Sequence, residues 1–120
     1  MACVVEFTDE FGSWWETLTT EQEDITLSVK LLEAKGPTLG FPHSSKVKNS
    51  KHTHMRELRV QSGGNPIRIF YAFNPLRNAI LLIGGDKTGD DRFYERMVPI
   101  ADKLYDEHID ELNREGHHVR

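Results

Sequence analysis

Hydrophobic and polar residues alternate most clearly near the middle of the chain, where three apolar runs are separated by two turn clusters. The runs cover residues 55–61, 67–73 and 79–84, and the clusters at 62–66 and 74–78 are rich in Gly, Asn and Pro. Short runs of β-branched and aromatic residues bounded by such clusters are typical of strands. Gly, Asn and Pro supply the backbone angles that tight turns need. The pattern therefore predicts a three-stranded antiparallel meander.

Side-chain alternation brings two arginines of this predicted meander together. Successive residues of a strand point to opposite faces of the sheet, so Arg59 faces away from Leu58, and we expect Arg68 of the next strand on the same face as Arg59. Lys87 follows the third strand, and Tyr94 begins the next helix. Guanidinium groups match phosphate oxygens in bidentate geometry, so the cluster suits a phosphate diester. The alternative is that both arginines are solvated on the polar face of a half-exposed sheet.

The N-terminal part of the chain predicts one strand and two helices. Residues 2–7 form a short apolar run that fits an added strand of the same sheet. Thr8 or Asp9 can cap the first helix, and Thr20 with Glu23 matches a capping box for the second. Each helix has one apolar stripe at helical spacing: Phe11, Trp14, Trp15 and Leu18, then Ile25, Val29 and Leu32. The two helices read as an αα-hairpin over residues 9–35 that covers the Leu58, Val60 and Ile69 face of the sheet.

Residues 37–54 are polar, basic and interrupted by Pro and Gly, which predicts a long irregular loop. Long loops in small domains are often functional, and this one carries three lysines and three histidines: Lys46, Lys48, Lys51, His43, His52 and His54. A general acid or base from the loop and a plain solvated loop both fit these residues. We expect no metal here, because alternate His residues without a nearby acid do not make a ligand set.

The C-terminal part predicts a helix that Thr88 or Asp90 can cap. Its apolar spacing runs through Phe93, Met97, Ile100, Leu104 and Leu112. Pro99 lies inside this pattern, and we expect it to kink the helix or to divide it in two.

These elements predict a single domain, residues 1–120, of the α+β class. Their order is β-α-α-β-β-β-α, with a small antiparallel sheet over residues 55–86 and the αα-hairpin on one of its faces. No apolar run approaches the roughly 20 residues of a membrane span, and the start MACVVEFTDEF lacks the basic and apolar regions of a signal peptide. Cys3 is the one cysteine, which excludes an internal disulfide and fits a reducing cytoplasm.

The charges are unevenly distributed along the chain, and the net charge of −4 includes a basic central region. Residues 1–34 carry a net charge of −7, residues 35–87 carry +7, and residues 88–120 carry −4. A basic region of this kind can mark an anionic partner. It also fits acidic helices packed beside a basic sheet.

Four motifs, in this order, resemble those of a known toxin group. They are Glu57-Leu58-Arg59, Pro66-Ile67-Arg68-Ile69-Phe70-Tyr71, Leu81-Leu82-Ile83-Gly84-Gly85-Asp86-Lys87 and Phe93-Tyr94-Glu95-Arg96. The chain resembles the RelE/ParE superfamily of bacterial type II toxins, and within it the phage-derived HigB-like branch. The resemblance covers nearly the whole chain.

The resemblance implies a metal-independent ribonuclease that cuts mRNA on the ribosome without a cofactor. Arg59 and Arg68 would stabilise the phosphorane, Lys87 would lie near the scissile phosphate, and Tyr94 would contact or stack on the substrate. The RNA-binding set would be Lys46, Lys48, Lys51, His52 and Tyr71. For the general acid and base, His52, His54, Lys51 and Tyr94 all remain candidates, and His54 is placed in the catalytic set.

The same resemblance leaves a second function open and implies a protein partner. Members of the ParE branch inhibit DNA gyrase without cutting RNA, which is the alternative to an mRNA endonuclease. The implied partners are the ribosome, mRNA and a cognate antitoxin, a HigA-like helix-turn-helix protein. Since residues 1–34 are acidic, we expect the antitoxin to contact apolar surface on the first or last helix, with some contact to the basic loop 43–54.

Overall fold

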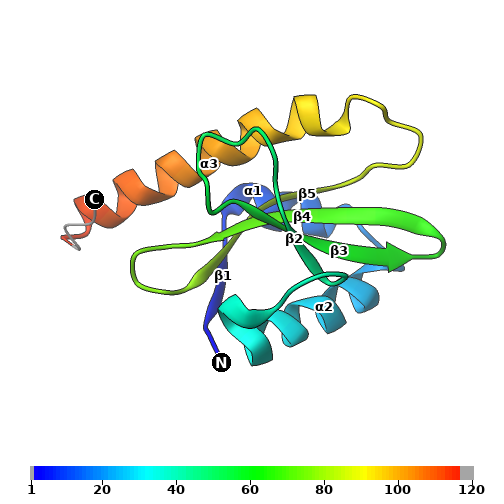
Figure 1. Ribbon diagram of the computed structural model, residues 1–120, viewed down its shortest axis with the longest axis horizontal. Helices are drawn as coiled ribbons and strands as arrows, with labels where there is room; N and C mark the ends of the chain where they lie inside the picture. Colours follow the sequence, from blue (N-terminus) through cyan, green and yellow to red (C-terminus); the bar gives the residue numbers. More distant parts are fainter. Residues whose placement is uncertain (1, 117–120) are drawn as a thin grey trace.

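A five-stranded sheet forms the centre of the protein, and helices cover both of its faces (Figure 1). The computed structural model describes residues 2–116. The helices are α1 (Asp9–Glu16), α2 (Glu21–Lys35) and α3 (Phe93–Arg114), with one 3-10 turn, η1 (Gly36–Thr38). The strands are β1 (Val5–Phe7), β2 (Ser44–Lys46), β3 (Arg56–Ser62), β4 (Asn65–Phe73) and β5 (Ala79–Asp86).

The predicted α+β class and meander are confirmed, with two differences in the sheet. The spatial order is β1-β5-β4-β3-β2, and β3, β4 and β5 pair in antiparallel fashion. β1 pairs with β5 in parallel, so the whole sheet is mixed although the meander itself is antiparallel. The stretch expected to be irregular also contains β2, which pairs with the free edge of β3. Each added strand is three residues long, too short to produce a recognisable alternation.

The two faces of the sheet carry separate apolar cores. Phe11 of α1 and Ile25 and Leu32 of α2 pack with Leu58, Val60 and Ile69, so the αα-hairpin lies on the predicted face. α3 crosses the opposite face, where it packs on a second group of buried residues: Phe70, Ala72, Ile80 and Leu82. Figure 1 shows α3 and α2 on opposite sides of the sheet.

An irregularity in the pairing of β4 with β5 decides which residues face α3. Phe70 pairs with Ile83, but the next residue, Tyr71, pairs with Leu81, so Leu82 is an extra residue. Such a bulge lets two consecutive residues face one side, and both Leu82 and Ile83 pack with the α3 core. The two glycines that follow then face opposite sides: a Cβ on Gly84 would lie 2.4 Å from the Trp14 ring, and one on Gly85 would lie 2.9 Å from the Phe93 ring.

Of the two helix caps predicted at the N-terminal helices, one is confirmed and one is wrong. Thr8 caps α1 by accepting a 3.0 Å hydrogen bond from the Phe11 amide, as expected. Thr20 precedes α2 but makes no side-chain cap, because its backbone is already helical (φ −71°, ψ −24°) and a capping side chain needs an extended residue. The expected capping box is therefore wrong.

α3 differs from its prediction in that Pro99 does not divide it. The helix runs unbroken from Phe93 to Arg114. Buried residues on both sides of Pro99, at Met97 and Ala101 among others, hold the two halves on the same sheet face. Ile100 of the predicted stripe is 40% exposed, and its neighbours in the core are Val98 and Ala101.

Candidate active site

Arg59 and Arg68 lie directly opposite each other on neighbouring strands, β3 and β4. They share the sheet face that α3 covers, so the prediction of a common face is confirmed. Their environments differ, since 29% of the Arg59 side chain is exposed but only 6% of the Arg68 side chain. The alternative that both arginines are solvated is thus wrong for Arg68.

A buried carboxylate, Glu57, lies between the two guanidinium groups. Glu57 is two residues before Arg59 on β3 and therefore faces the same side of the sheet. One of its oxygens accepts hydrogen bonds from Ser45 Oγ at 2.8 Å and from Arg59 Nη1 at 3.4 Å. The other accepts a 2.7 Å hydrogen bond from the Tyr94 hydroxyl. A buried carboxylate needs this kind of compensation from cations and donors.

Arg68 keeps one donor uncommitted. Its Nη1 donates to the Ile67 carbonyl at 3.1 Å. Its Nε lies 3.9 Å from the Glu57 carboxylate and finds no hydrogen-bond acceptor in the described part of the chain. Buried donors without an acceptor are costly and uncommon, so Arg68 Nε is an unmet hydrogen-bond donor in this site.

Tyr94, in the first turn of α3, closes the other side of the site. Its pKa is raised to about 12, first because burial disfavours the phenolate and then because the Glu57 carboxylate is adjacent. At neutral pH the phenol is therefore protonated and acts as a donor. The Lys87 ammonium lies 5.3 Å from the centre of the Tyr94 ring, within cation–π range. Lys87 itself is positioned by its backbone amide, which donates to the Pro66 carbonyl at 3.0 Å.

We call this group of neighbouring side chains the arginine cleft: Glu57, Arg59, Arg68, Lys87 and Tyr94. An open cavity of about 320 Å³ reaches Glu57 and Tyr94 from solvent. The exposed lysines of β2 and the turn after it, Lys46 and Lys48, line the same cavity. The cleft thus has cations at its mouth and a carboxylate with a phenol at its base.

The histidines of the basic loop lie elsewhere, against the middle of α3. His52 and His54 pack against the Tyr105 ring, with centroids 4.8 Å and 5.2 Å from it. His52 Nε2 pairs with Asp106 at 2.9 Å, and Lys51 pairs with the same carboxylate. We call these residues the histidine cluster.

His54 therefore does not join the arginine cleft, contrary to the prediction. Tyr105 is eleven residues after Tyr94 on one continuous helix, a separation of about 16 Å at the usual rise per residue. Asp102 explains the placement, because it accepts hydrogen bonds from the Ser50 hydroxyl and, at 3.1 Å, from the Lys51 amide. Together with Asp106 it fixes this part of the loop on α3.

Tyr71 is the second predicted residue that lies away from the cleft. It is fully buried and belongs to the core under the αα-hairpin, on the opposite sheet face from Arg68. Its hydroxyl shares a 2.6 Å hydrogen bond with Ser44 of β2. A side chain in this position has no surface for RNA, so the assignment of Tyr71 to an RNA surface is corrected.

Glu57 is the residue that the sequence interpretation missed as a site residue. The signal was present, because Glu57 and Arg59 are two apart on a predicted strand and must share a face. The contact with Ser45 could not have been found, since it depends on β2.

Two further features, metal-binding clusters and membrane-spanning helices, are absent from the described residues. Residues 2–116 contain no group of three or more His, Cys, Asp and Glu side chains placed to hold a metal ion. Within the same range, no helix is both long and apolar enough to cross a membrane. The cleft offers guanidinium, ammonium, carboxylate and phenol groups, which bind anions and transfer protons.

Comparison with known proteins identifies the family. Residues 13–106 match the family described as phage derived protein Gp49-like (DUF891). The chain is 46% identical over 92 residues to "Putative toxin HigB3" of Mycobacterium tuberculosis, which covers 75% of the chain and 79% of that protein. It is 35% identical over 104 residues to "Putative toxin HigB2" of the same organism, and there it covers 84% of the chain but spans about half, 52%, of the relative.

The match includes every residue of the arginine cleft, and the similarity to two HigB proteins agrees with the resemblance found in the motifs. The chain belongs to the phage-derived Gp49-like family (DUF891) and is a HigB-like member of it.

Proposed function

We propose that the chain is the toxin of a type II toxin–antitoxin system and that it cuts mRNA on the ribosome, in the cytoplasm. The observation that carries this proposal is the buried Arg68, whose Nε has no acceptor among the described residues and which lies opposite Arg59. The two relatives named as HigB toxins support the general assignment. The arginine cleft supports the chemistry.

A phosphate diester suits the cleft by charge. Arg68 offers Nε, Arg59 is 29% exposed and can turn toward a ligand, and Lys87 adds a third cation next to Tyr94. Guanidinium donors placed where charge develops stabilise a phosphorane more than the ground state. Lys46 and Lys48 at the mouth would bind neighbouring phosphates, which gives the sequence-independent part of RNA affinity.

RNA supplies its own nucleophile, so the protein must move two protons. In the proposed reaction Glu57 accepts the proton of the ribose 2′-hydroxyl as this oxygen attacks phosphorus. The bond from phosphorus to the 5′-oxygen then breaks, and Tyr94 donates its proton to that leaving oxygen. The products are a 2′,3′-cyclic phosphate and a free 5′-hydroxyl. Glu57 and Tyr94 suit these roles because they are the carboxylate and the protonated phenol that line the cleft.

The test is primer extension on cellular mRNA shortly after induction of the chain. The proposal expects new 5′ ends in phase with codons, and expects them to disappear in an Arg68→Lys variant that keeps the positive charge without the planar fork. Lys103→Ala, on the exposed side of α3, is the matched control and should cut normally. Intact mRNA together with trapped gyrase–DNA breaks would contradict the nuclease and favour gyrase as the target.

A further inference from the structure

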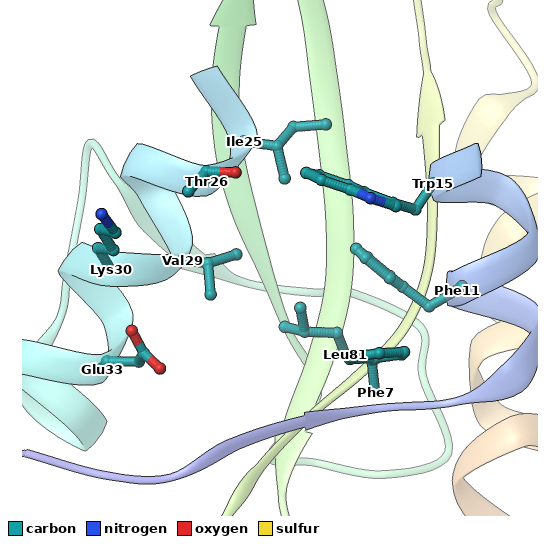
Figure 2. Close-up of a pocket in the computed structure, with 10 residues that line it drawn as sticks. Phe7, Phe11, Trp15, Ile25, Thr26, Val29, Lys30, Glu33 and Leu81 are labelled. Atoms are coloured by element: carbon teal, nitrogen blue, oxygen red, sulfur yellow. The ribbon is translucent and has the colours of Figure 1, made fainter. Parts of the chain in front are cut away.

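An apolar groove lies between α1 and α2, on the opposite sheet face from the arginine cleft. Figure 2 shows Phe11 and Trp15 of α1 facing Ile25 and Val29 of α2, with Leu81 of β5 between them. The groove has a volume of about 250 Å³ and is open to solvent. The αα-hairpin thus covers the sheet incompletely and leaves apolar side chains accessible between its two helices.

An acidic cleft adjoins this groove, between the start of α1 and the second half of α3. Its volume is about 470 Å³. Six carboxylates line it: Glu6, Asp9, Glu10, Glu107, Glu111 and Glu115. The basic residues among the described lining are Arg114 and His108, and burial lowers the pKa of His108 and so favours its neutral form. The cleft is therefore strongly negative.

Phe7 connects the two hollows, because its side chain lines both of them. It is 66% exposed, the most exposed aromatic residue of β1 and the two helices after it, and its ring lies 5.9 Å from that of Phe11. A large apolar side chain displayed beside an apolar groove and a charged rim is typical of a protein interaction site. We call the groove, Phe7 and the acidic cleft together the Phe7 surface.

We propose that the Phe7 surface binds the antitoxin of this toxin, through a segment with large apolar side chains next to a run of Lys or Arg. This inference rests on the proposed function, since it takes the chain to be a toxin that a partner protein neutralises. The apolar side chains would fill the groove between α1 and α2. The basic residues would lie over the acidic cleft and be paired with its carboxylates.

The negative charge of the Phe7 surface favours a basic segment of another protein over RNA or a second copy of this chain. RNA would be repelled, because its phosphates would face six carboxylates. A second copy using the same surface would place two acidic clefts against each other, since a two-fold contact pairs a patch with itself. A basic segment of a different protein meets neither obstacle, and residues 1–34 around the surface carry a net charge of −7.

The position of the surface has a consequence for inhibition. The groove lies between the two helices of the αα-hairpin. Glu111 of the acidic cleft is 17 residues after Tyr94 along α3, about 25 Å at the usual helical rise. A partner segment bound here leaves Arg59 and Arg68 uncovered. Binding of the antitoxin and binding of phosphate should therefore be separable by mutation.

The probe is the purified protein that is encoded by the gene next to this one. Calorimetry measures its binding to the whole chain and to each variant of the chain. Phe7→Ser removes the exposed ring and should weaken binding at least roughly tenfold, as loss of a central apolar contact does. Glu10→Lys with Glu111→Lys should weaken binding by roughly tenfold at low salt and much less at high salt. Glu16→Lys with Glu23→Lys makes the same charge change at exposed positions outside both hollows, and should bind normally.

Two results would overturn the inference directly. In the first, the wild-type chain and both sets of variants bind the neighbouring protein equally well. In the second, the neighbouring protein does not bind at all. Loss of binding in Arg59→Ala with Arg68→Ala would move the contact to the arginine cleft. A dimer of the chain alone that Phe7→Ser dissociates would make a second copy the occupant. If Phe7→Ser does not fold by circular dichroism, the double charge reversal decides, because its two positions are exposed.

The readout also separates this inference from the proposed function. Binding is measured without RNA, so a chain that binds through the Phe7 surface but cuts no mRNA supports the docking site and contradicts the nuclease. A chain that cuts mRNA but binds its neighbour elsewhere gives the reverse result.

Discussion

The Nε of Arg68 lies 3.9 Å from the nearer carboxylate oxygen of Glu57, and no hydrogen bond joins them. Both side chains are 6% exposed. The charges are close enough to compensate each other, but the donor of Arg68 remains unused and the carboxylate is satisfied by Ser45, Arg59 and Tyr94. Because the Nε atom is buried, the proposed contact of a phosphate oxygen with Arg68 requires the side chains that cover it to move.

Arg68→Lys should reduce RNA cleavage by about 10² to 10³, the usual effect of removing one transition-state donor. Lysine keeps the charge beside Glu57, so the fold should survive, whereas alanine would leave a buried carboxylate with less compensation. Cleavage assays and thermal melts on Arg68→Lys and on the exposed control Arg77→Lys check this. A folded Arg68→Lys chain with full activity would rule out the proposed role.

Tyr94 should ionise with a pKa of about 12. The variant Glu57→Gln should lower this pKa toward the ordinary tyrosine value. The reason is that the adjacent carboxylate is one cause of the raised pKa. The raised pKa also means that Tyr94 contributes stability below the ordinary tyrosine pKa of about 10, which is lost as pH rises through about 12. Absorbance titration of the wild-type chain minus Tyr94→Phe isolates this group. An unchanged Tyr94 titration in Glu57→Gln would contradict the contact.

His54→Gln should leave RNA cleavage unchanged, because the His54 ring packs on Tyr105 rather than on Tyr94 of the arginine cleft, but it should change stability in acid. Burial and then the charge of His52 lower the pKa of His54 below 6.5. The neutral form is thus favoured by folding, and the stability that it contributes is present above pH 6.5 and lost as pH falls through the lowered pKa. Denaturant melts across this range should show a smaller acid loss in His54→Gln than in the wild type or in the exposed control His43→Gln.

Gly84→Ala should destabilise the protein by roughly 1–3 kcal/mol, the usual cost of overpacking, because the new methyl group would lie 2.4 Å from the Trp14 ring. Gly40→Ala is the matched control, since no atom lies within 4 Å of a Cβ at that position. Urea melts of the two variants provide the comparison. Equal stability of both would show that Trp14 can move away without cost.

Lys46→Ala with Lys48→Ala should weaken binding of a short RNA and reduce its salt dependence by about two units of logarithmic slope, at roughly one per lysine. Lys30→Ala with Lys103→Ala removes two exposed lysines outside the arginine cleft and should leave both quantities unchanged. Filter binding over a range of salt concentrations measures the slopes. Equal slopes for the two double variants would show that Lys46 and Lys48 do not contact RNA phosphates.

Much of the fold, and the placement of Arg59 with Arg68 in the site, follow from the alternation of side-chain direction along a strand, which repeats every two residues. Because alternation is geometric, it places Arg59 with Arg68 and opposite Leu58 without knowledge of the rest of the fold. The HigB-like family, the αα-hairpin and its sheet face were also predictable, since long apolar stripes leave few ways to pack.

The parts that could not be predicted depend on contacts between distant residues. Ser44, Ser45 and Lys46 have no apolar pattern and become β2 because the edge of β3 offers unpaired backbone groups. His52 and His54 pack on the middle of α3 because Asp102 and Asp106, about 50 residues later, hold their loop. The burial of Arg68 depends on the packing of α3 across its sheet face, so its unpaired Nε is not visible from spacing alone.

The unbroken course of α3 through Pro99 places three regions of the protein on one helix of 22 residues, about 33 Å long. Tyr94 lies at one end, Tyr105 with the histidine cluster lies near the middle, and Glu111 lies near the other end. The arginine cleft and the acidic cleft beside Phe7 thus share one structural element, although no side chain of one region touches the other among the contacts described.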